Sequence, residues 1–430
     1  MSAAAARRRK QLAKKKEAAT AASASGADDP VAARLSALLS EQDEAERSEA
    51  TAYEALQLAQ SHVRRQVQAG NFAAAADKAY EVGLTLLSDR WGRVSVASQL
   101  LAELLRVLTE THTGCTAEWA KRFRLLDEAH RSALARSGPS MDPDELDRLG
   151  RLHLQFLRGA VKWSDSLGTV RYGDRELHEL LGRECWRVAA GWQERAGGSK
   201  RDPVHQKDGD DEGADDASVP WLRCEAVTHL ALAERPDAIA DYLRDLPSPL
   251  PAHLKFGHTG PPAERDSLLT RSVLVLAAVE NLRDANVLLR AYLDGIEERD
   301  TDVLKKSYMD KKDGVAPSHA IFCAMLLRVC EKETKTAPLY KWLLKNFQSE
   351  LLKLYKPDVV DAYCSKIGRV YFGIEPPPDM MATLEGMMKG GLGGSPAGGG
   401  QNPMMNPAAM MQNPAMMQQM MQQMQQMGMG

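Results

Sequence analysis

The sequence lacks the features by which membrane, secreted and nucleic-acid-binding proteins are usually recognised. No apolar run approaches the ~18 residues of a membrane-spanning helix, and the best stretch, residues 273–279, stops at Glu280. The six cysteines form no C-x-x-C pair and follow no secretory leader, so we expect reduced, mostly buried thiols and a cytosolic protein. The 55 basic and 58 acidic residues give a net charge of −3, which argues against a nucleic-acid-binding protein.

Sequence signatures of catalysis and of cofactor or metal binding are missing as well. The glycine-rich segment 386–400 has no P-loop spacing and no strand before it. His178 begins an H-E-L-L-G sequence that lacks the second histidine of a zinc site. The acidic residues 208–212 lack the twelfth-position glutamate of a calcium loop, where Val219 stands. No Gly-x-Ser-x-Gly elbow is present. We therefore predict that the protein is not an enzyme and binds no cofactor or metal.

Hydrophobic periodicity predicts helices almost throughout residues 29–371. In residues 100–108 and 288–296, apolar side chains recur at i, i+1, i+4, i+5 and i+8, which places one apolar stripe on each helix. No segment alternates apolar and polar residues as a half-buried strand does. Turn residues separate consecutive helices at 70–71, 138–143, 173–174 and 236–238. We therefore predict an all-α fold, an α-solenoid of consecutive antiparallel helix pairs that forms a TPR-like superhelix, although no strict repeat period is visible.

Composition divides the chain into an arm, a helical array and a tail. Seven basic residues and one acidic residue lie within the first twenty positions, so we expect a solvated arm; a nuclear signal, a transit peptide or a tail for an acidic surface are the alternatives. The predicted domains are a disordered basic arm at 1–29, the solenoid at 30–378, and a glycine linker with a Met-rich tail at 379–430. Within the solenoid, a disordered acidic loop at 193–219 joins an N-terminal half at 30–192 to a C-terminal half at 220–378.

Several stretches of the array resemble one family of helical scaffolds. They are Tyr53-Glu54-Ala55 with Gly70-Asn71-Phe72, Ala160 to Ser164, Gly173 to Leu181, Val273-Leu274 with Asn281 and Ala285-Asn286, and Tyr363 to Pro377. Their order and spacing over residues 31–378 resemble the Golgi to ER traffic protein 4 family, the cytosolic α-solenoid scaffold of the guided entry pathway for tail-anchored membrane proteins. None of these stretches is a catalytic signature.

The resemblance implies partners rather than an active site. In the family, the N-terminal helices dock on a dimeric targeting ATPase. The C-terminal helices hold a ubiquitin-like-domain protein or, in animals, a BAG-domain scaffold. Clients reach the ATPase from a TPR co-chaperone, which would therefore be an indirect partner of this chain.

Site residues are predicted for both partners. The candidate ATPase-docking residues are Arg34, Arg64 and Arg65, for which a solvated helix face is the alternative. The candidate groove for the C-terminal partner comprises Ile321, Phe322, Met325, Leu326, Tyr340 and Leu343, for which internal core is the alternative.

The first helix departs from the family pattern. It leads into Glu41, Asp43, Glu44 and Glu46, whereas the family helix is expected to be basic. We therefore predict that the basic arm, residues 7–16, supplies the missing positive charge as a flexible steering element.

Methionine is concentrated in the tail, where 15 of the 19 methionines lie at or after Met380. Asn-Pro units with paired methionines begin at Asn402, Asn406 and Asn413, and residues 417–424 can form a short amphipathic helix. Flexible thioether side chains suit apolar surfaces of varied shape, such as the transmembrane segments of clients. The units also resemble the client-binding tail of the TPR co-chaperone. The predicted client-binding residues are Met404, Met405, Met410, Met411, Met416, Met417, Met420, Met421, Met424 and Met427; a biased tail with no client role is the alternative.

The sequence thus favours a non-enzymatic scaffold in the post-translational targeting of tail-anchored membrane proteins to the ER. The alternative is a helical-repeat subunit of another cytosolic or nuclear complex, such as a proteasome-related one, which the basic arm would suit.

Overall fold

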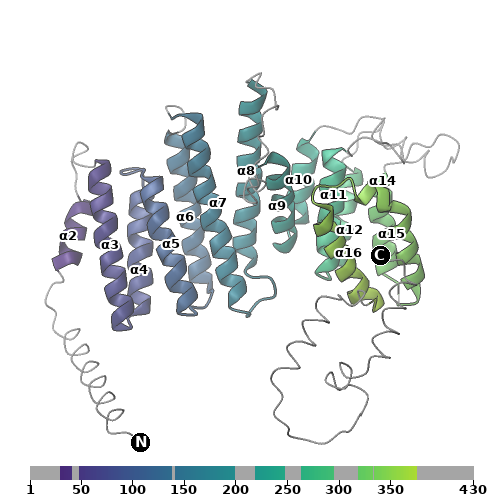
Figure 1. Cartoon of the computed structure of the whole chain (residues 1–430), viewed down its shortest axis with the longest axis horizontal. Helices are drawn as coiled ribbons and strands as arrows, with labels where there is room; N and C mark the ends of the chain where they lie inside the picture. The colour runs from purple at the N-terminus through teal and green to yellow at the C-terminus, as the bar shows by residue number, and fades with distance from the viewer. Residues whose placement is uncertain are drawn as a thin grey trace, which may run out of the picture. The chain divides into compact units, whose positions relative to one another are not determined.

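The computed structural model describes residues 30–40, 48–137, 141–198, 218–246, 263–294, 318–332 and 334–374. Within these ranges every regular element is helical (Figure 1). The helices are α2 (Pro30–Ser40), α3 (Glu49–Ala69), α4 (Phe72–Leu87), α5 (Val94–Glu110), α6 (Ala117–Ser137), α7 (Pro143–Ser166), α8 (Arg175–Gly198), α9 (Val219–Leu232), α10 (Pro236–Asp245), α11 (Glu264–Ala278), α12 (Leu282–Asp294), α14 (Ser318–Cys330), the 3₁₀ turn η4 (Thr334–Thr336), α15 (Ala337–Leu351) and α16 (Pro357–Phe372). The predicted all-α fold is confirmed.

The two ends of α3 illustrate how the sequence sets the helix ends. The Ser48 side chain accepts a hydrogen bond from the Thr51 amide at the start of α3. Gly70 ends α3 in the left-handed conformation, at φ 82°, and its amide donates to the Val67 carbonyl. Glycine adopts this φ without strain, so the chain reverses and α4 begins at Phe72.

Packing in the first part of the array follows a two-layer pattern. Each helix from α3 to α6 contacts the next helix and the next but one. The predicted stripe on α5 faces inward, because Leu100, Leu101, Leu104 and Leu108 are fully buried. At the α8–α9 crossing, a Cβ on Gly182 would lie 2.9 Å from the Ala226 carbonyl oxygen, so glycine permits the close approach. The α-solenoid organisation is thus present as predicted.

Helix α11 is the centre of the later part of the array. Its residues are buried on all sides from Leu268 to Ala278, and α9, α10, α12, α14 and α16 all pack against it. The apolar run 273–279 is therefore the last part of a core helix and its C-cap, Val279. None of the helices in the described ranges is long and apolar enough to cross a membrane.

Two helix ends differ from the predicted domain limits. Helix α8 continues beyond residue 192 to Gly198. In this last part, the half-buried Trp192 packs against the core cluster and Arg195 pairs with Asp147 of α7. Helix α9 begins at Val219 rather than at 220. The acidic segment 199–217, the basic arm and the Met-rich tail lie outside the described residues.

Candidate partner-binding surfaces

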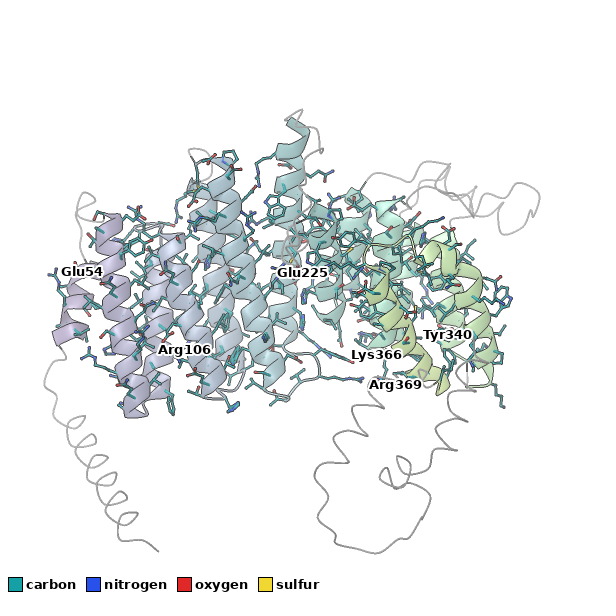
Figure 2. The ribbon with its side chains drawn as sticks, in the orientation of Figure 1. Glu54, Arg106, Glu225, Tyr340, Lys366 and Arg369 are labelled. Carbon is teal, nitrogen blue, oxygen red and sulfur yellow. The ribbon has the colours of Figure 1, made fainter. Side chains whose placement is uncertain are left out.

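Arg34 lies on α2 and is engaged with α3. Its Nη2 atom lies 3.2 Å from Oε1 of Glu54, and both side chains are about half exposed. Figure 2 places Glu54 on the outer helices at the start of the array. The ion pair joins α2 to α3 at the surface, where such a pair contributes about 0 to 1 kcal/mol, so Arg34 already has an acidic partner within the chain.

Arg64 and Arg65 lie together further along α3. Both are exposed, and with Gln57, Gln60, Ser61 and Gln68 they line a shallow depression of about 410 Å³. The pKa of Glu103 on α5 is lowered, chiefly by its hydrogen bond from Arg106. The positive charge of Arg64 contributes to the same shift, so Arg64 and Glu103 interact electrostatically. Arg64 and Arg65 thus form a basic, polar face that is separate from the Arg34–Glu54 pair.

Four of the six residues predicted for the C-terminal groove lie in the core. Phe322, Leu326, Tyr340 and Leu343 are at most 2% exposed. The Tyr340 hydroxyl donates to the Cys364 carbonyl oxygen at 2.6 Å, and its ring stacks on Phe372 at 4.6 Å. These side chains therefore hold α14, α15 and α16 together, as the core alternative requires.

Ile321 and Met325, the other two predicted residues, are half-buried on α14. The structure places Met325 beside an accessible apolar surface that the sequence analysis missed. Leu339 and Trp342 of α15 are 53% and 52% exposed, and with Met325 and Val329 they line a pocket of about 370 Å³ between α14 and α15. We refer to Met325, Val329, Leu339 and Trp342 as the α14–α15 pocket.

The pattern of apolar residues on α15 indicates this pocket. Tyr340, Leu343 and Phe347 supply the buried stripe of α15 at helical spacing. Leu339 and Trp342 are a second apolar pair, three residues apart, that falls outside this stripe. An apolar pair in excess of one stripe indicates surface that is available to another molecule.

One basic side chain lines the α14–α15 pocket, and two others are exposed elsewhere on α15. Arg328 lines it and is 81% exposed, although it lies 3.4 Å from the Glu331 carboxylate. Lys341 and Lys345 are exposed on α15. A partner segment that carries apolar anchors and acidic flanks would therefore complement this surface.

Residues considered for chemistry have structural roles. The His178 Nε2–H donates to the Tyr172 carbonyl oxygen at 2.6 Å, and its Nδ1 lies 2.7 Å from Nδ1 of His229. Burial, followed by the nearby Glu225, raises the pKa of Cys185 well above its ordinary value, so the thiol stays protonated. All six cysteines are free, and all but the half-buried Cys115 are buried. The ten predicted client-binding methionines lie outside the described residues.

Comparison with known proteins provides the family. The sequence profile described as GET4, Golgi to ER traffic protein 4, matches residues 69–391. Protein GET4 of Arabidopsis thaliana is 22% identical over 337 residues, which cover 75% of this chain and 86% of that protein. A crystal structure of C. therm. Get4 superposes with a TM-score of 0.47 and 21% identity, over 85% of this chain and 96% of that one. Since the family profile spans most of the sequence, this chain belongs to the Golgi to ER traffic protein 4 family.

Proposed function

We propose that this chain is a non-enzymatic scaffold that bridges a targeting ATPase and a ubiquitin-like-domain protein or BAG-domain scaffold in the cytosol. Family membership implies a role in the pathway that delivers tail-anchored membrane proteins to the ER. The observation that carries the bridging role is the presence of two different accessible surfaces: a basic face on α3, near the start of the array, and the α14–α15 pocket near its end. A scaffold of this kind acts by holding two partners at once.

For the ATPase, we assign the docking surface to Arg64 and Arg65. Exposed arginines attract an acidic surface over several ångströms and fix its orientation by hydrogen bonds. The basic arm adds seven positive charges within residues 7–16 and would steer the same encounter. Deletion of residues 1–29 should lower the association rate and flatten its salt dependence; unchanged values for both would remove the arm from the proposal.

For the C-terminal partner, we assign the α14–α15 pocket rather than the buried residues Phe322, Leu326, Tyr340 and Leu343. Trp342 supplies a large apolar contact, and Arg328 adds positive charge at the same pocket. TPR co-chaperones would join the assembly through this partner.

The Met-rich tail is assigned to client binding on its sequence. A helix from Pro414 to Met427 would span ~21 Å, so one such helix covers part of a ~30 Å transmembrane segment. Capture of a transmembrane helix should be compared between the full chain and a chain that ends at Pro378. Equal capture by both would contradict a client-binding tail without affecting the scaffold proposal.

The decisive experiment for the scaffold is affinity purification of the full chain from its own cells. Recovery of the targeting ATPase together with a ubiquitin-like or BAG-domain protein is the expected result. Recovery of proteasomal or nuclear subunits in their place would contradict the proposal. A chain with Arg64→Ala and Arg65→Ala should recover less of the ATPase and the wild-type amount of the other partner, which distinguishes bridging from indirect association.

A further inference from the structure

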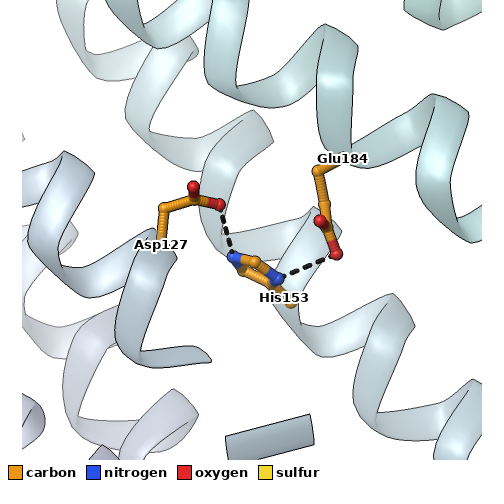
Figure 3. Close-up of side chains that lie close together, drawn as sticks. All are labelled: Asp127, His153 and Glu184. Carbon is orange, nitrogen blue, oxygen red and sulfur yellow. Dashed lines mark hydrogen bonds and ion pairs between the residues drawn. The ribbon is translucent and has the colours of Figure 1, made fainter. Parts of the chain in front are cut away.

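Three helices bring a histidine and two carboxylates together in the interior. Asp127 of α6, His153 of α7 and Glu184 of α8 are at most 2% exposed (Figure 3). The His153 Nδ1 lies 2.9 Å from Glu184 Oε1, and its Nε2 lies 3.2 Å from Asp127 Oδ1. Each ring nitrogen therefore faces a different carboxylate, and the single side chain of His153 links α6 to α8.

Each of the two carboxylates is paired with an arginine. Arg131 Nη2 lies 2.7 Å from Asp127 Oδ2, and Arg187 donates to both oxygens of Glu184, at 2.8 and 2.5 Å. Burial alone would raise the pKa of Glu184, but the charge of His153 and the Arg187 hydrogen bonds together lower it to about 2. An ionised carboxylate accepts hydrogen bonds and donates none.

The proton count at His153 follows from these contacts. The Glu184 carboxylate accepts from Nδ1, which must therefore carry a hydrogen. A neutral imidazole has only one N–H, so its Nε2 would turn a lone pair toward the negative Oδ1 of Asp127. Within the part of the chain that the structure describes, neither Nε2 nor Oδ1 has a hydrogen-bond partner, and both atoms are buried. Although this contact is not aligned as a hydrogen bond, the two atoms are 3.2 Å apart and buried, where repulsion between a lone pair and a carboxylate oxygen is poorly screened.

We propose that His153 is a buried imidazolium at neutral pH. The proton that it binds on folding lets the ring of this α7 residue interact favourably with carboxylates of both α6 and α8. Its pKa is raised: burial acts against the charge, but Glu184 and Asp127 together outweigh it. The proton makes this junction sensitive to alkaline conditions and insensitive to mild acid.

The neighbouring charged and titratable groups agree with this assignment. On α6 they are Asp127, His130 and Arg131, and on α8 they are Glu184 and Arg187. The His130 ring stacks on His153 with centroids 4.4 Å apart. Burial, followed by the charge of His153, holds the pKa of His130 well below its ordinary value, so His130 stays neutral and does not repel its neighbour.

A metal ion fits these residues poorly. The carboxylates approach different nitrogens of one ring, so an ion on Nε2 would leave Glu184 bound to the other nitrogen. Such an ion would have two protein ligands, fewer than the three or four typical of zinc sites. Arg131 and Arg187 already neutralise both carboxylates and would repel a divalent cation.

The direct test is NMR of the full chain labelled with ¹⁵N in its histidines. Between pH 7 and 8, His153 should show protons on both ring nitrogens, with the resonances assigned by their loss in His153→Asn. A singly protonated His153 in the wild-type chain would overturn the proposal, whether or not any variant folds. Displacement of a His153 ring proton by Zn²⁺ at neutral pH would also overturn it in favour of a metal site.

A second measurement uses Glu184→Gln, whose side-chain amide can donate to a neutral Nδ1. This variant should lose the imidazolium signal. Above pH 7, the unfolding equilibrium constant of the wild type should rise up to tenfold more per pH unit than that of the variant, until the pKa of His153 is passed. Glu145→Gln, which removes a carboxylate from the exposed pair with Arg148, is the control and should keep the wild-type profile. Identical alkaline profiles for Glu184→Gln and the wild type would contradict the proposal.

Discussion

Lys366 on α16 donates a hydrogen bond through Nζ to the hydroxyl of Tyr172, 194 positions earlier in the chain, at 2.5 Å. Its Nζ also lies 4.5 Å from the centre of the Tyr172 ring. The adjacent Arg171 pairs with Glu280 at 2.8 Å, in the turn between α11 and α12. The α7–α8 loop therefore contacts α16, the last helix in the described ranges, and Figure 2 labels Lys366 at this junction. Tyr172 couples the first part of the array to the helix that packs beside α15.

Removing the Tyr172 hydroxyl should loosen this junction. Tyr172→Phe keeps the ring for the two nearby cations and loses one partly buried hydrogen bond, so we expect about 0.5 to 1.5 kcal/mol of destabilisation. Hydrogen exchange of the α16 amides should accelerate, whereas exchange in α4 and α5 should not change. Tyr363→Phe on α16 is the matched control. Equal exchange of α16 in the two variants would show that the hydroxyl contact does not hold the helix.

Mild acid should weaken the same region through His178 and His229. Burial is the main cause that lowers the pKa of both side chains, and it lowers that of His229 to about 3. Below pH ~6.5 the unfolded chain binds protons that the folded chain excludes, so the free energy of unfolding falls by about 1.4 kcal/mol per pH unit for each such histidine. As the pH falls, the loss of stability due to His229 continues until the pKa of the folded state is reached. Above pH ~6.5 this contribution to stability is fully present.

Denaturant unfolding between pH 7 and pH 5 measures this loss. His229→Asn retains an amide that can donate to Nδ1 of His178 but does not titrate, so its stability should fall less steeply than that of the wild type. A slope as steep as the wild-type slope would exclude His229 as a source of the acid sensitivity.

Substitutions of two adjacent residues at the α14–α15 pocket should affect partner binding and protein stability differently. Trp342 is half exposed, so Trp342→Ala should cost ~0.5 kcal/mol or less of stability but at least ~2 kcal/mol of affinity for the C-terminal partner. The adjacent Leu343 is fully buried, and Leu343→Ala should cost about 2 to 5 kcal/mol of stability. Calorimetric titration and thermal unfolding of each variant test both statements.

Val287→Ala on α12, another exposed apolar residue, is the control for Trp342→Ala. It should leave affinity and stability near the wild-type values. Wild-type affinity in Trp342→Ala would place the partner elsewhere, for example in the groove of about 570 Å³ between α15 and α16 that Leu352 and Val360 line.

Removing the charges of Arg64 and Arg65 should weaken the ATPase complex. Exposed ion pairs contribute about 0.2 to 1 kcal/mol each, so the double alanine variant should bind roughly two- to thirtyfold more weakly, with a smaller salt dependence. Arg244→Ala with Arg290→Ala removes the same charge from exposed positions on α10 and α12 and should have little effect. Equal losses in both double variants would indicate a general effect of net charge.

Local sequence determined much of the helical framework. Gly70 with Asn71 predicts a helix end because glycine adopts positive φ without strain, and the turn is where it was expected. The apolar stripe of α5 predicts its buried face because a helix repeats every 3.6 residues. The motifs that resemble the family lie in the sequence itself, and the family profile matches residues 69–391.

Tertiary structure decided which side chains remain accessible and which distant ones meet. Periodicity places Tyr340, Trp342 and Leu343 on one helix, but only the positions of α14 and α16 bury two of them and leave Trp342 at the surface. Likewise, no local pattern links Asp127 with Glu184 or Tyr172 with Lys366, because each pair is formed by helices that fold back from separate parts of the chain. The sequence alone therefore determined the helices and the family, whereas the partner surface and the buried proton depend on which helix faces pack together.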